Sequence, residues 1–560
     1  MLKQGAARDI RAEELIERLR GLDAGKRRQF FAKLRQMGID VARLPIVPAC
    51  ERGRHGLSYA QQRQWFLWKL DPHSAAYHIP VVLRLQGTVD ANALEQAFHG
   101  LIDRHESLRT RFVEEDGEVH QQIEEALAFT LDVTRLQAGA GQEHVLHDYL
   151  EARILEPFDL EKGPLIRAAL VCTGEAEQVL VVVLHHSITD GWSMGVMVDD
   201  LLALYKAAVE HTAAQLEPLP IQFRDYAAWQ RQWLEAGERE RQLGWWKECL
   251  GEGRALLELP TDHARPPVQS HRGARFDIPL PARLAAALKA LARSQDTTLF
   301  SLLLASFQVL LHRYSGQAEV RVGVPMANRN RRESERLIGL FINTQVFQGV
   351  MHGHTRFSEL LQQLQQMGLE AQAYQDLPFE QLVEALQPER SLSHNPLFQV
   401  MYNHQAKGGA LAGLPGLAVE SLTWDSGTAQ LDLTLETCDE GDGLSATLVY
   451  ATDLFEAATI ARMAGHWLGL LEAILAQPDA PIAALPMLSP AEREAQLQGW
   501  NATATDYPLT TPVHHLIEAQ VLHNPDAPAL AFGAEALSYA ELNRRANRLA
   551  HALIAQGVGP

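Results

Sequence analysis

The chain has 560 residues, of which 46% are hydrophobic and 21% are charged, and its formal net charge is -19. This length favours more than one domain, and the acidic balance argues against nucleic acid or an anionic membrane as the main partner. No stretch approaches the roughly 20 apolar residues of a membrane helix and the N-terminus has no signal-peptide pattern, so we expect a cytoplasmic protein without membrane association.

The cysteines are far apart and form no CxxC pair. This spacing predicts neither a metal site nor a disulfide framework, and it fits a reducing compartment. The four are Cys50, Cys172, Cys249 and Cys438.

Apolar residues at helical spacing predict one or two amphipathic helices over residues 10–40. Two interpretations are open for this segment. It is either a packing appendage or a linker or docking element towards an upstream protein. We assign residues 1–46 to an N-terminal helical linker or docking segment.

A mixed α/β region follows, which we bound at residues 47–222. Its most informative strand is the short apolar run at 179–184, which suits a strand buried on both faces. The other predicted elements are a strand at 81–85 and helices at 91–102 and 192–211.

A second region of the same kind is bounded at 223–487. Its clearest element is a helix from Thr298 to about Tyr314, which Gly316 ends. The remaining predictions are a strand at 319–324, a helix at 357–369, strands at 430–437 and 444–450, and a helix at 457–475. The two halves are similar in size and kind, which predicts two similar lobes.

The chain after this region has linker composition, with six prolines between residues 477 and 512. We assign 488–510 to a linker. Residues 511–560 are too few for an independent core, and they look like the opening of another domain.

The segment His185–Gly191, HHSITDG, lies where the buried strand meets a helix. Such a junction places side chains at the end of a sheet, beside the N–H groups of a helix N-terminus. There His186 would take a proton from an attacking amine or hold the amine in place. The N–H of Gly191 would stabilise an oxyanion, and Ser193 would cap the helix.

A histidine pair alone is weak support for catalysis, since a structural histidine is the commoner outcome. The wider sequence, however, resembles the condensation domains of nonribosomal peptide synthetases, which are relatives of chloramphenicol acetyltransferase. HHSITDGWS resembles the HHxxxDG signature of that family. Its companions occur in the family's order over about residues 50–490: LSYAQQRQWFLWKL at 57–70, RHESLRTRF at 104–112, IQFRDYAAWQ at 221–230, IGLFINTQ at 338–345, YQDLPFEQLV at 374–383 and SLSHNPLFQVMYNHQ at 391–405. Two positions depart from the usual motifs: Tyr374 often is His, and His394 often is Arg.

The resemblance implies an α/β fold of two chloramphenicol-acetyltransferase-like lobes in a V-shaped pseudo-dimer, with the active site at the lobe junction. It implies amide-bond formation between a thioester on an upstream donor carrier protein and the amine of an aminoacyl thioester on a downstream acceptor carrier. The substrates would ride on the phosphopantetheine of these partners, and we expect no metal or cofactor in the chain itself.

The same resemblance supplies the candidate site. We expect His186 to act on the amine, His185 to be mainly structural, and Asp190 and Gly191 to shape the catalytic loop. Asp190 would pair with an arginine, for which Arg63 is one candidate. Trp192 and Ser193 would support the loop, and Asn343 and Tyr374 are substrate-channel candidates.

The tail at 536–560, ALSYAELNRRANRLAHALIAQGVGP, resembles the first motif of an adenylation domain, so residues 511–560 are predicted to be its truncated start. Intact histidines argue against a heterocyclisation domain, and the position before an adenylation-like tail argues against epimerisation. A non-catalytic recruitment module and a coenzyme A-dependent acyltransferase remain as alternatives. The stretch RQWFLWKLDPHSAAYHIP suggests a subtype that accepts a D-configured donor.

Overall fold

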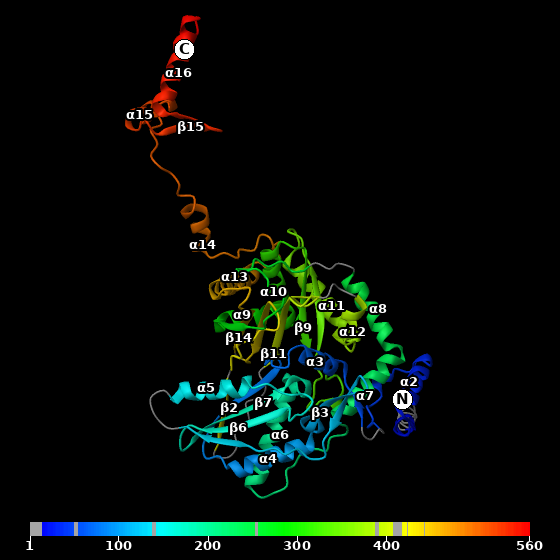
Figure 1. Ribbon diagram of the computed structural model, residues 1–560. Coiled ribbons are helices and arrows are strands. Elements are labelled where there is room, and N and C mark those ends of the chain that lie inside the picture. The colour runs from blue at the N-terminus through cyan, green and yellow to red at the C-terminus, as the bar shows by residue number, and fades with distance from the viewer. Residues whose placement is uncertain are drawn as a thin grey trace. The chain divides into compact units, whose positions relative to one another are not determined.

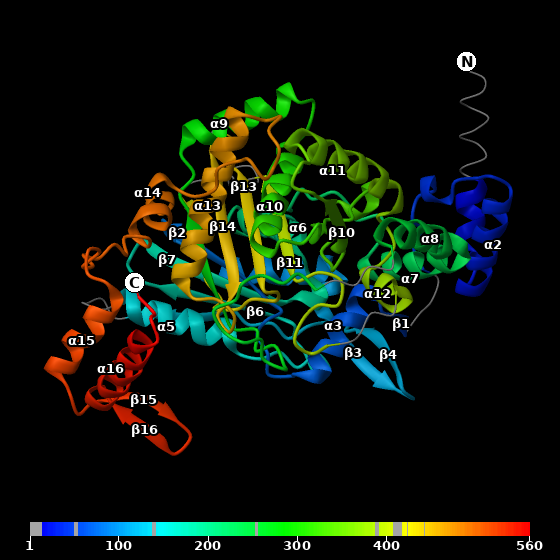
Figure 2. The same cartoon turned by 90° about the horizontal axis from the view of Figure 1, so that it is seen from above.

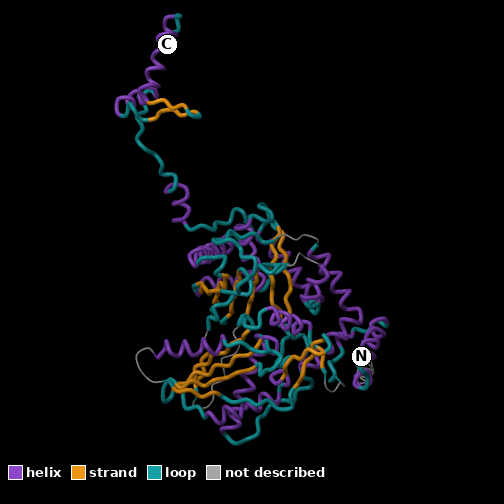
Figure 3. The backbone as a smooth tube through the Cα atoms, viewed as in Figure 1, coloured by secondary structure: helices purple, strands orange, loops and turns teal. Residues whose placement is uncertain are grey.

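The protein is described by a computed structural model covering residues 14–49, 54–136, 142–251, 256–386, 391–406, 417–422, 424–441 and 443–559. It divides into two compact units, Met1–Ser489 and Pro490–Pro560, and each is described by itself (Figure 1). The larger unit contains two main sheets, visible as two groups of strands in Figure 3. Among the described residues, no helix is long and apolar enough to span a membrane.

The first lobe is built on a five-stranded sheet in the order β12-β2-β7-β6-β5. Strand β7 (Glu177–His185) lies at its centre and is buried from Gln178 to His185, as its continuous apolar run predicts. Its neighbours are β2 (His78–Gln86) and β6 (Ile166–Cys172), and β5 (Asp132–Arg135) pairs with β6 at one edge. The predicted strands at 81–85 and 179–184 are therefore confirmed.

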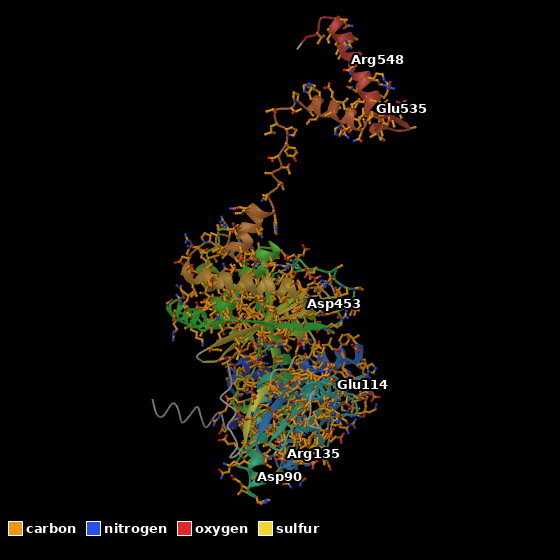
Figure 4. All side chains as sticks on the ribbon, turned by 90° about the vertical axis from the view of Figure 1, so that its left-hand side faces the viewer. Asp90, Glu114, Arg135, Asp453, Glu535 and Arg548 are labelled. Carbon is orange, nitrogen blue, oxygen red and sulfur yellow. The ribbon has the colours of Figure 1, made fainter. Side chains whose placement is uncertain are left out.

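Helices cover both faces of this sheet. Helices α4 (Ala91–Arg104) and α6 (Gly191–Val209) pack against one another below it in Figure 1, and α5 (Gln142–Leu155) lies on the opposite side. Asp90, labelled in Figure 4, begins α4 by accepting hydrogen bonds from the N–H groups of Asn92 and Ala93. A small sheet of β1 (His55–Gly56), β4 (Glu118–Ile123) and β3 (Thr110–Glu115) lies beside α3 (Tyr59–Leu70).

The second lobe carries a six-stranded sheet in the order β10-β9-β11-β13-β14-β8. Its long helix α10 (Leu299–Ser315) is capped by Thr298 and ends at Gly316 in the left-handed conformation, as predicted. The strands are β8 (Gly273–Ile278), β9 (Glu319–Met326), β10 (Asn343–Val350), β11 (Val400–Ala406), β13 (Leu433–Asp439) and β14 (Leu444–Ala451). Helices α9 (Ala282–Ser294), α11 (Phe357–Ala371) and α13 (Ala457–Ala476) complete its core (Figure 2).

Among the features that were not predicted from the sequence are one strand pairing and one helix kink. Strand β12 (Ala418–Leu422) comes from the second half of the chain but pairs with β2 of the first lobe. Helices α7 (Phe223–Trp233) and α8 (Arg239–Leu250) are joined through a kink at Gly237, which has a φ of 102°. The pairing of β12 with β2 fastens the second half of the chain to the first lobe.

The N-terminal segment packs as an integral part of this unit. Its described residues form a helix over 14–20, helix α2 (Ala24–Gln36) and a short turn at Val41–Arg43. The segment lies against α7 and α8 in Figures 1 and 2, where Leu19, Phe31 and Leu34 share a buried cluster with Trp229 and Trp233. The contacts favour the packing interpretation, and a docking role stays a prediction.

The smaller unit contains α14 (Pro490–Glu494), α15 (Val513–His523), a hairpin of β15 (Pro528–Phe532) and β16 (Glu535–Ser538), and α16 (Tyr539–Ala555). None of its described residues is buried. Apolar side chains such as Leu522, Phe532 and Leu549 are exposed, and Glu535 and Arg548 project from the same unit in Figure 4.

Candidate active site

The strand-to-helix junction at the end of β7 positions both histidines. His185 is the last residue of the buried strand, His186 begins a short 3-10 turn (His186–Ile188), and Asp190 caps α6. The backbone N–H of His186 donates to the carbonyl of Tyr77 on the neighbouring segment, at 2.8 Å. The junction is therefore held by the sheet on one side and by the helix on the other.

His185 has a structural position. Its side chain is buried, and its Nδ1 accepts a hydrogen bond from the backbone N–H of Ser187 at 3.1 Å. Burial disfavours the imidazolium, and the neighbouring His78 adds to this effect, so the pKa of His185 lies well below its usual value. A neutral ring held in this way supports the backbone of the loop.

His186 faces the cleft between the lobes. Its Nδ1 donates to the carbonyl of Thr189 at 2.7 Å, which makes Nε2 the ring nitrogen available to a substrate. The cleft has a volume of about 120 Å³, and both lobes line it. The lining residues from the first lobe include Arg63, Gln64 and Tyr77, and those from the second include Asn343, Phe379, Glu380 and Asn395.

Asp190 is a buried structural anion. Its carboxylate accepts hydrogen bonds from the N–H of Ser193 at 2.8 Å, the hydroxyl of Ser193 at 2.7 Å and the N–H of Phe341 at 2.9 Å. Its charge is balanced by Arg329 at 3.1 Å, and both side chains are at most 2% exposed. The helix is thus capped by Asp190, and the prediction that Ser193 is the cap is wrong. Ser193 instead bonds Asp190 and the carbonyl of Gly339.

An arginine does pair with Asp190, but the candidate named from the sequence is wrong. Arg63 lies on α3 and faces Glu380 at 3.6 Å across the cleft, over the ring of Phe379. Burial raises the pKa of Glu380, and the nearby guanidinium opposes that shift. Arg63 was one candidate for this pairing, whereas the arginine that reaches the loop, Arg329, comes from the second lobe.

Gly191 and Trp192 begin α6. Gly191 has no left-handed φ, and a Cβ atom placed on it would meet no atom of the described residues within 4 Å. Its role in an oxyanion site stays a prediction. Trp192 is 52% exposed, and its indole N–H donates to the carbonyl of Glu335 at 3.0 Å, so it ties α6 to the second lobe.

The two channel candidates differ in position. Asn343 lines the cleft, but its amide is engaged: it donates to the carbonyls of Gln375 and Leu377 and accepts from the N–H of Phe379. It therefore fastens the start of α12 (Phe379–Leu386), whose first residues form the cleft wall. Tyr374 lies outside this lining, stacked on Trp245 with ring centroids 4.5 Å apart, and it is not placed as a channel residue.

Several cleft residues were missed from the sequence. Gln64 on α3 and Tyr77, the residue just before β2, line the cleft, and burial raises the pKa of Tyr77. Gln64 is buried, and its Oε1 has no hydrogen-bond partner among the described residues. The available signal for Gln64 was its position next to Arg63 in the first motif. Arg329 had none, because it lies outside the motifs.

This fold of two α/β lobes, with a histidine delivered from a buried central strand into the cleft between them, defines the class of chloramphenicol-acetyltransferase-like proteins. The family model of the condensation domain matches residues 51–497 of this chain. The chain is 44% identical over 524 residues to a linear gramicidin synthase of Brevibacillus parabrevis, an alignment that covers 92% of this chain and 7% of that protein.

Solved structures agree. A four-domain nonribosomal peptide synthetase bound to AMP and glycine matches with a TM-score of 0.79 and 26% identity, covering 90% of this chain and 39% of that one. The X-domain from teicoplanin biosynthesis matches with a TM-score of 0.73 and 30% identity, covering 79% of this chain and all of that one. The chain therefore belongs to the condensation domain family, whose members catalyse amide-bond formation in nonribosomal peptide synthetases.

Proposed function

We propose that this chain joins an acyl or peptidyl thioester on an upstream donor carrier to the amine of an aminoacyl thioester on a downstream acceptor carrier. The main support for this proposal is the position of His186. Its Nδ1 is held by the carbonyl of Thr189, and its ring faces a cleft lined by both lobes. The chain spans only 7% of the gramicidin synthase that it resembles, so its carriers and substrates are part of this proposal.

The chemistry needs one new bond and one leaving group. The amine nitrogen attacks the thioester carbonyl, the C–N bond forms, the C–S bond breaks, and the donor pantetheine leaves as a thiol. Because Nδ1 of His186 keeps its proton towards Thr189, Nε2 can accept the proton that the amine loses or hold the amine for attack. The thioester is already activated, so the proposed transfer requires no metal or nucleotide.

Positioning supplies much of the rate in such a site. Two tethered substrates that meet in one cleft react as if at high local concentration. We propose that the carrier arms enter the cleft from opposite faces, so that the donor carbonyl and acceptor nitrogen meet beside His186. The motif around Arg63, Gln64 and Tyr77 lines this cleft, which is why we place discrimination of a D-configured donor there.

The defining experiment offers the same acyl group as a carrier-bound thioester and as a coenzyme A thioester, together with a loaded acceptor carrier. Mass spectrometry of the acceptor is expected to show transfer from the carrier-bound donor. Equal transfer from coenzyme A would instead indicate a free-standing acyltransferase. Donors ending in D- and L-residues are compared in the same assay, and preference for the L donor would contradict the subtype.

A recruitment role is the second candidate, because the similar X-domain from teicoplanin biosynthesis was solved in complex with OxyB. The intact His185–His186 pair and the formed cleft favour catalysis in this chain. A recruitment module would leave both carrier substrates unchanged in the transfer assay.

We further propose that residues 511–560, within the unit Pro490–Pro560, are the start of an adenylation domain. The unit has secondary structure but no buried residue among those described, and Leu522, Phe532 and Leu549 are exposed. Apolar faces of this kind require a covering partner, which the remainder of an adenylation domain would supply.

A cytoplasmic location fits the four scattered cysteines.

A further inference from the structure

Four consecutive side chains in the second lobe each contact a different part of the larger unit. They form the turn at residues 328–331, with the sequence Asn-Arg-Asn-Arg, which we name the NRNR turn. Asn328 donates to the hydroxyl of Tyr226 on α7 at 3.1 Å, and Asn330 donates to Asp376 beside the cleft wall at 3.1 Å. The two arginines reach more distant segments, around Asp190 and around Leu44.

One arginine leads to the catalytic loop. Arg329 bonds Asp190, and Asp190 directly follows Thr189, whose carbonyl orients the ring of His186. A displacement of the NRNR turn therefore moves Asp190 and the carbonyl that fixes His186. Both side chains of this ion pair are at most 2% exposed, so the contact between Arg329 and Asp190 is shielded from water.

The other arginine leads to the N-terminal segment. Arg331 donates to the carbonyl of Leu44 at 2.9 Å, and its guanidinium lies 4.2 Å from the ring centre of Trp229. The same segment is tied to α7 a few residues later, where the N–H of Ala49 donates to Asp225 at 2.8 Å. Its helices add the buried contacts of Leu19 and Phe31.

We propose that residues 14–49, which are the described part of the N-terminal segment and the three residues after it, position the catalytic histidine through the NRNR turn, and that Arg331 is the positioning residue that connects them. This inference rests on the proposed function for its kinetic test. Arg331 is not among the described residues that line the cleft, so it acts on the rate of the chemical step and leaves substrate binding alone. On this proposal the segment contributes to the transfer reaction, whereas the sequence also allowed a packing appendage without such a role.

The test compares Arg331→Met and Arg331→Lys with Arg28→Met. Methionine keeps the packing on Trp229 but cannot donate to Leu44, whereas lysine still carries a donor. Arg28 anchors the same segment to Glu235 at 2.8 Å through exposed side chains and does not touch the NRNR turn. It is the matched control for a general loosening of the segment.

With loaded carriers, Arg331→Met is expected to lower kcat roughly tenfold with KM for both carriers unchanged, because small misplacements of catalytic groups cost this much or more. Arg331→Lys is expected to recover part of kcat, and Arg28→Met to match the wild type. Wild-type kcat in a folded Arg331→Met variant would overturn the proposal. So would an equal loss in Arg28→Met, which would indicate packing alone.

A second readout does not depend on transfer. In protein labelled with ¹⁵N-histidine, the His186 signal, assigned by its loss in His186→Ala, reports the hydrogen bond from Nδ1 to Thr189. We expect this signal to shift in Arg331→Met and to stay in place in Arg28→Met. An inert wild type would refute the proposed function, while the signal would still decide the role of Arg331: an unmoved signal in Arg331→Met contradicts the positioning path.

Discussion

The buried pair of Asp190 and Arg329 offers a quantitative test of how the catalytic loop is held. Asp190→Asn keeps the shape of the side chain but removes its charge, and it leaves Arg329 buried without a counter-charge. Breaking a buried pair on one side costs about 3–5 kcal/mol of unfolding free energy. The amide must also replace an acceptor of four hydrogen bonds, and part of the helix cap is lost, which adds to the cost.

The assay is a double-mutant cycle of urea unfolding, followed by tryptophan fluorescence. We expect Asp190→Asn and Arg329→Met each to lower the unfolding free energy strongly. The loss in the double variant should be smaller than the sum of the two single losses by about 2–3 kcal/mol. Asp199→Asn is the matched control. Asp199 lies on the same helix, α6, and its ion pair with Arg336 is exposed, so the pair contributes less than about 1 kcal/mol. Additive losses, or a loss in Asp190→Asn no larger than the control, would refute the buried-pair account.

Four further outcomes follow from the site and its surroundings. Tyr374→Phe is expected to leave kcat and KM unchanged, because the side chain stacks on Trp245 outside the cleft. A changed KM would show that Tyr374 contacts a substrate. Asn343→Ala is expected to destabilise the protein by about 2 kcal/mol or more in urea unfolding, because it removes bonds to three backbone groups around residues 375–379; an unchanged midpoint would contradict its fastening role. The pKa of His185 is lowered in the folded protein, so as the pH falls this histidine binds a proton in the unfolded chain before it does so in the folded protein. The unfolding free energy therefore falls as the pH drops below about 6.5. His185→Asn should flatten that pH dependence, and an unaltered slope would count against the neutral buried ring. Deleting Pro490–Pro560 should keep the unfolding midpoint of the larger unit and reduce binding of the dye ANS, since the deleted unit exposes its apolar side chains; a lowered midpoint would show that the larger unit depends on it.

Local patterns predicted the elements that carry the histidines. The apolar run before His185 predicted a fully buried strand, and the helical spacing after Gly191 predicted α6, because burial on two faces and on one face leave different periodicities. The same reasoning placed α10 and its end at Gly316. These features depend on neighbours in sequence, which is why the chain alone was sufficient.

Contacts between distant segments were beyond that reasoning. Arg63 and Arg329 are both arginines, and only the fold brings the second one to Asp190 across 139 residues. Strand β12 joins the first lobe from the second half of the chain for a similar reason, since edge pairing leaves no local signature. Tyr374 was predicted as a channel residue from motif membership, whereas its ring packs with Trp245 on α8.

The most direct test of the account is transfer between loaded carriers with and without His186. Wild-type protein is mixed with a donor carrier bearing an acyl or peptidyl thioester and an acceptor carrier bearing an aminoacyl thioester, and the acceptor is followed by mass spectrometry. The account predicts that its mass rises by that of the donor acyl group with wild-type protein and does not rise with folded His186→Ala. Transfer at the wild-type rate by His186→Ala would contradict it.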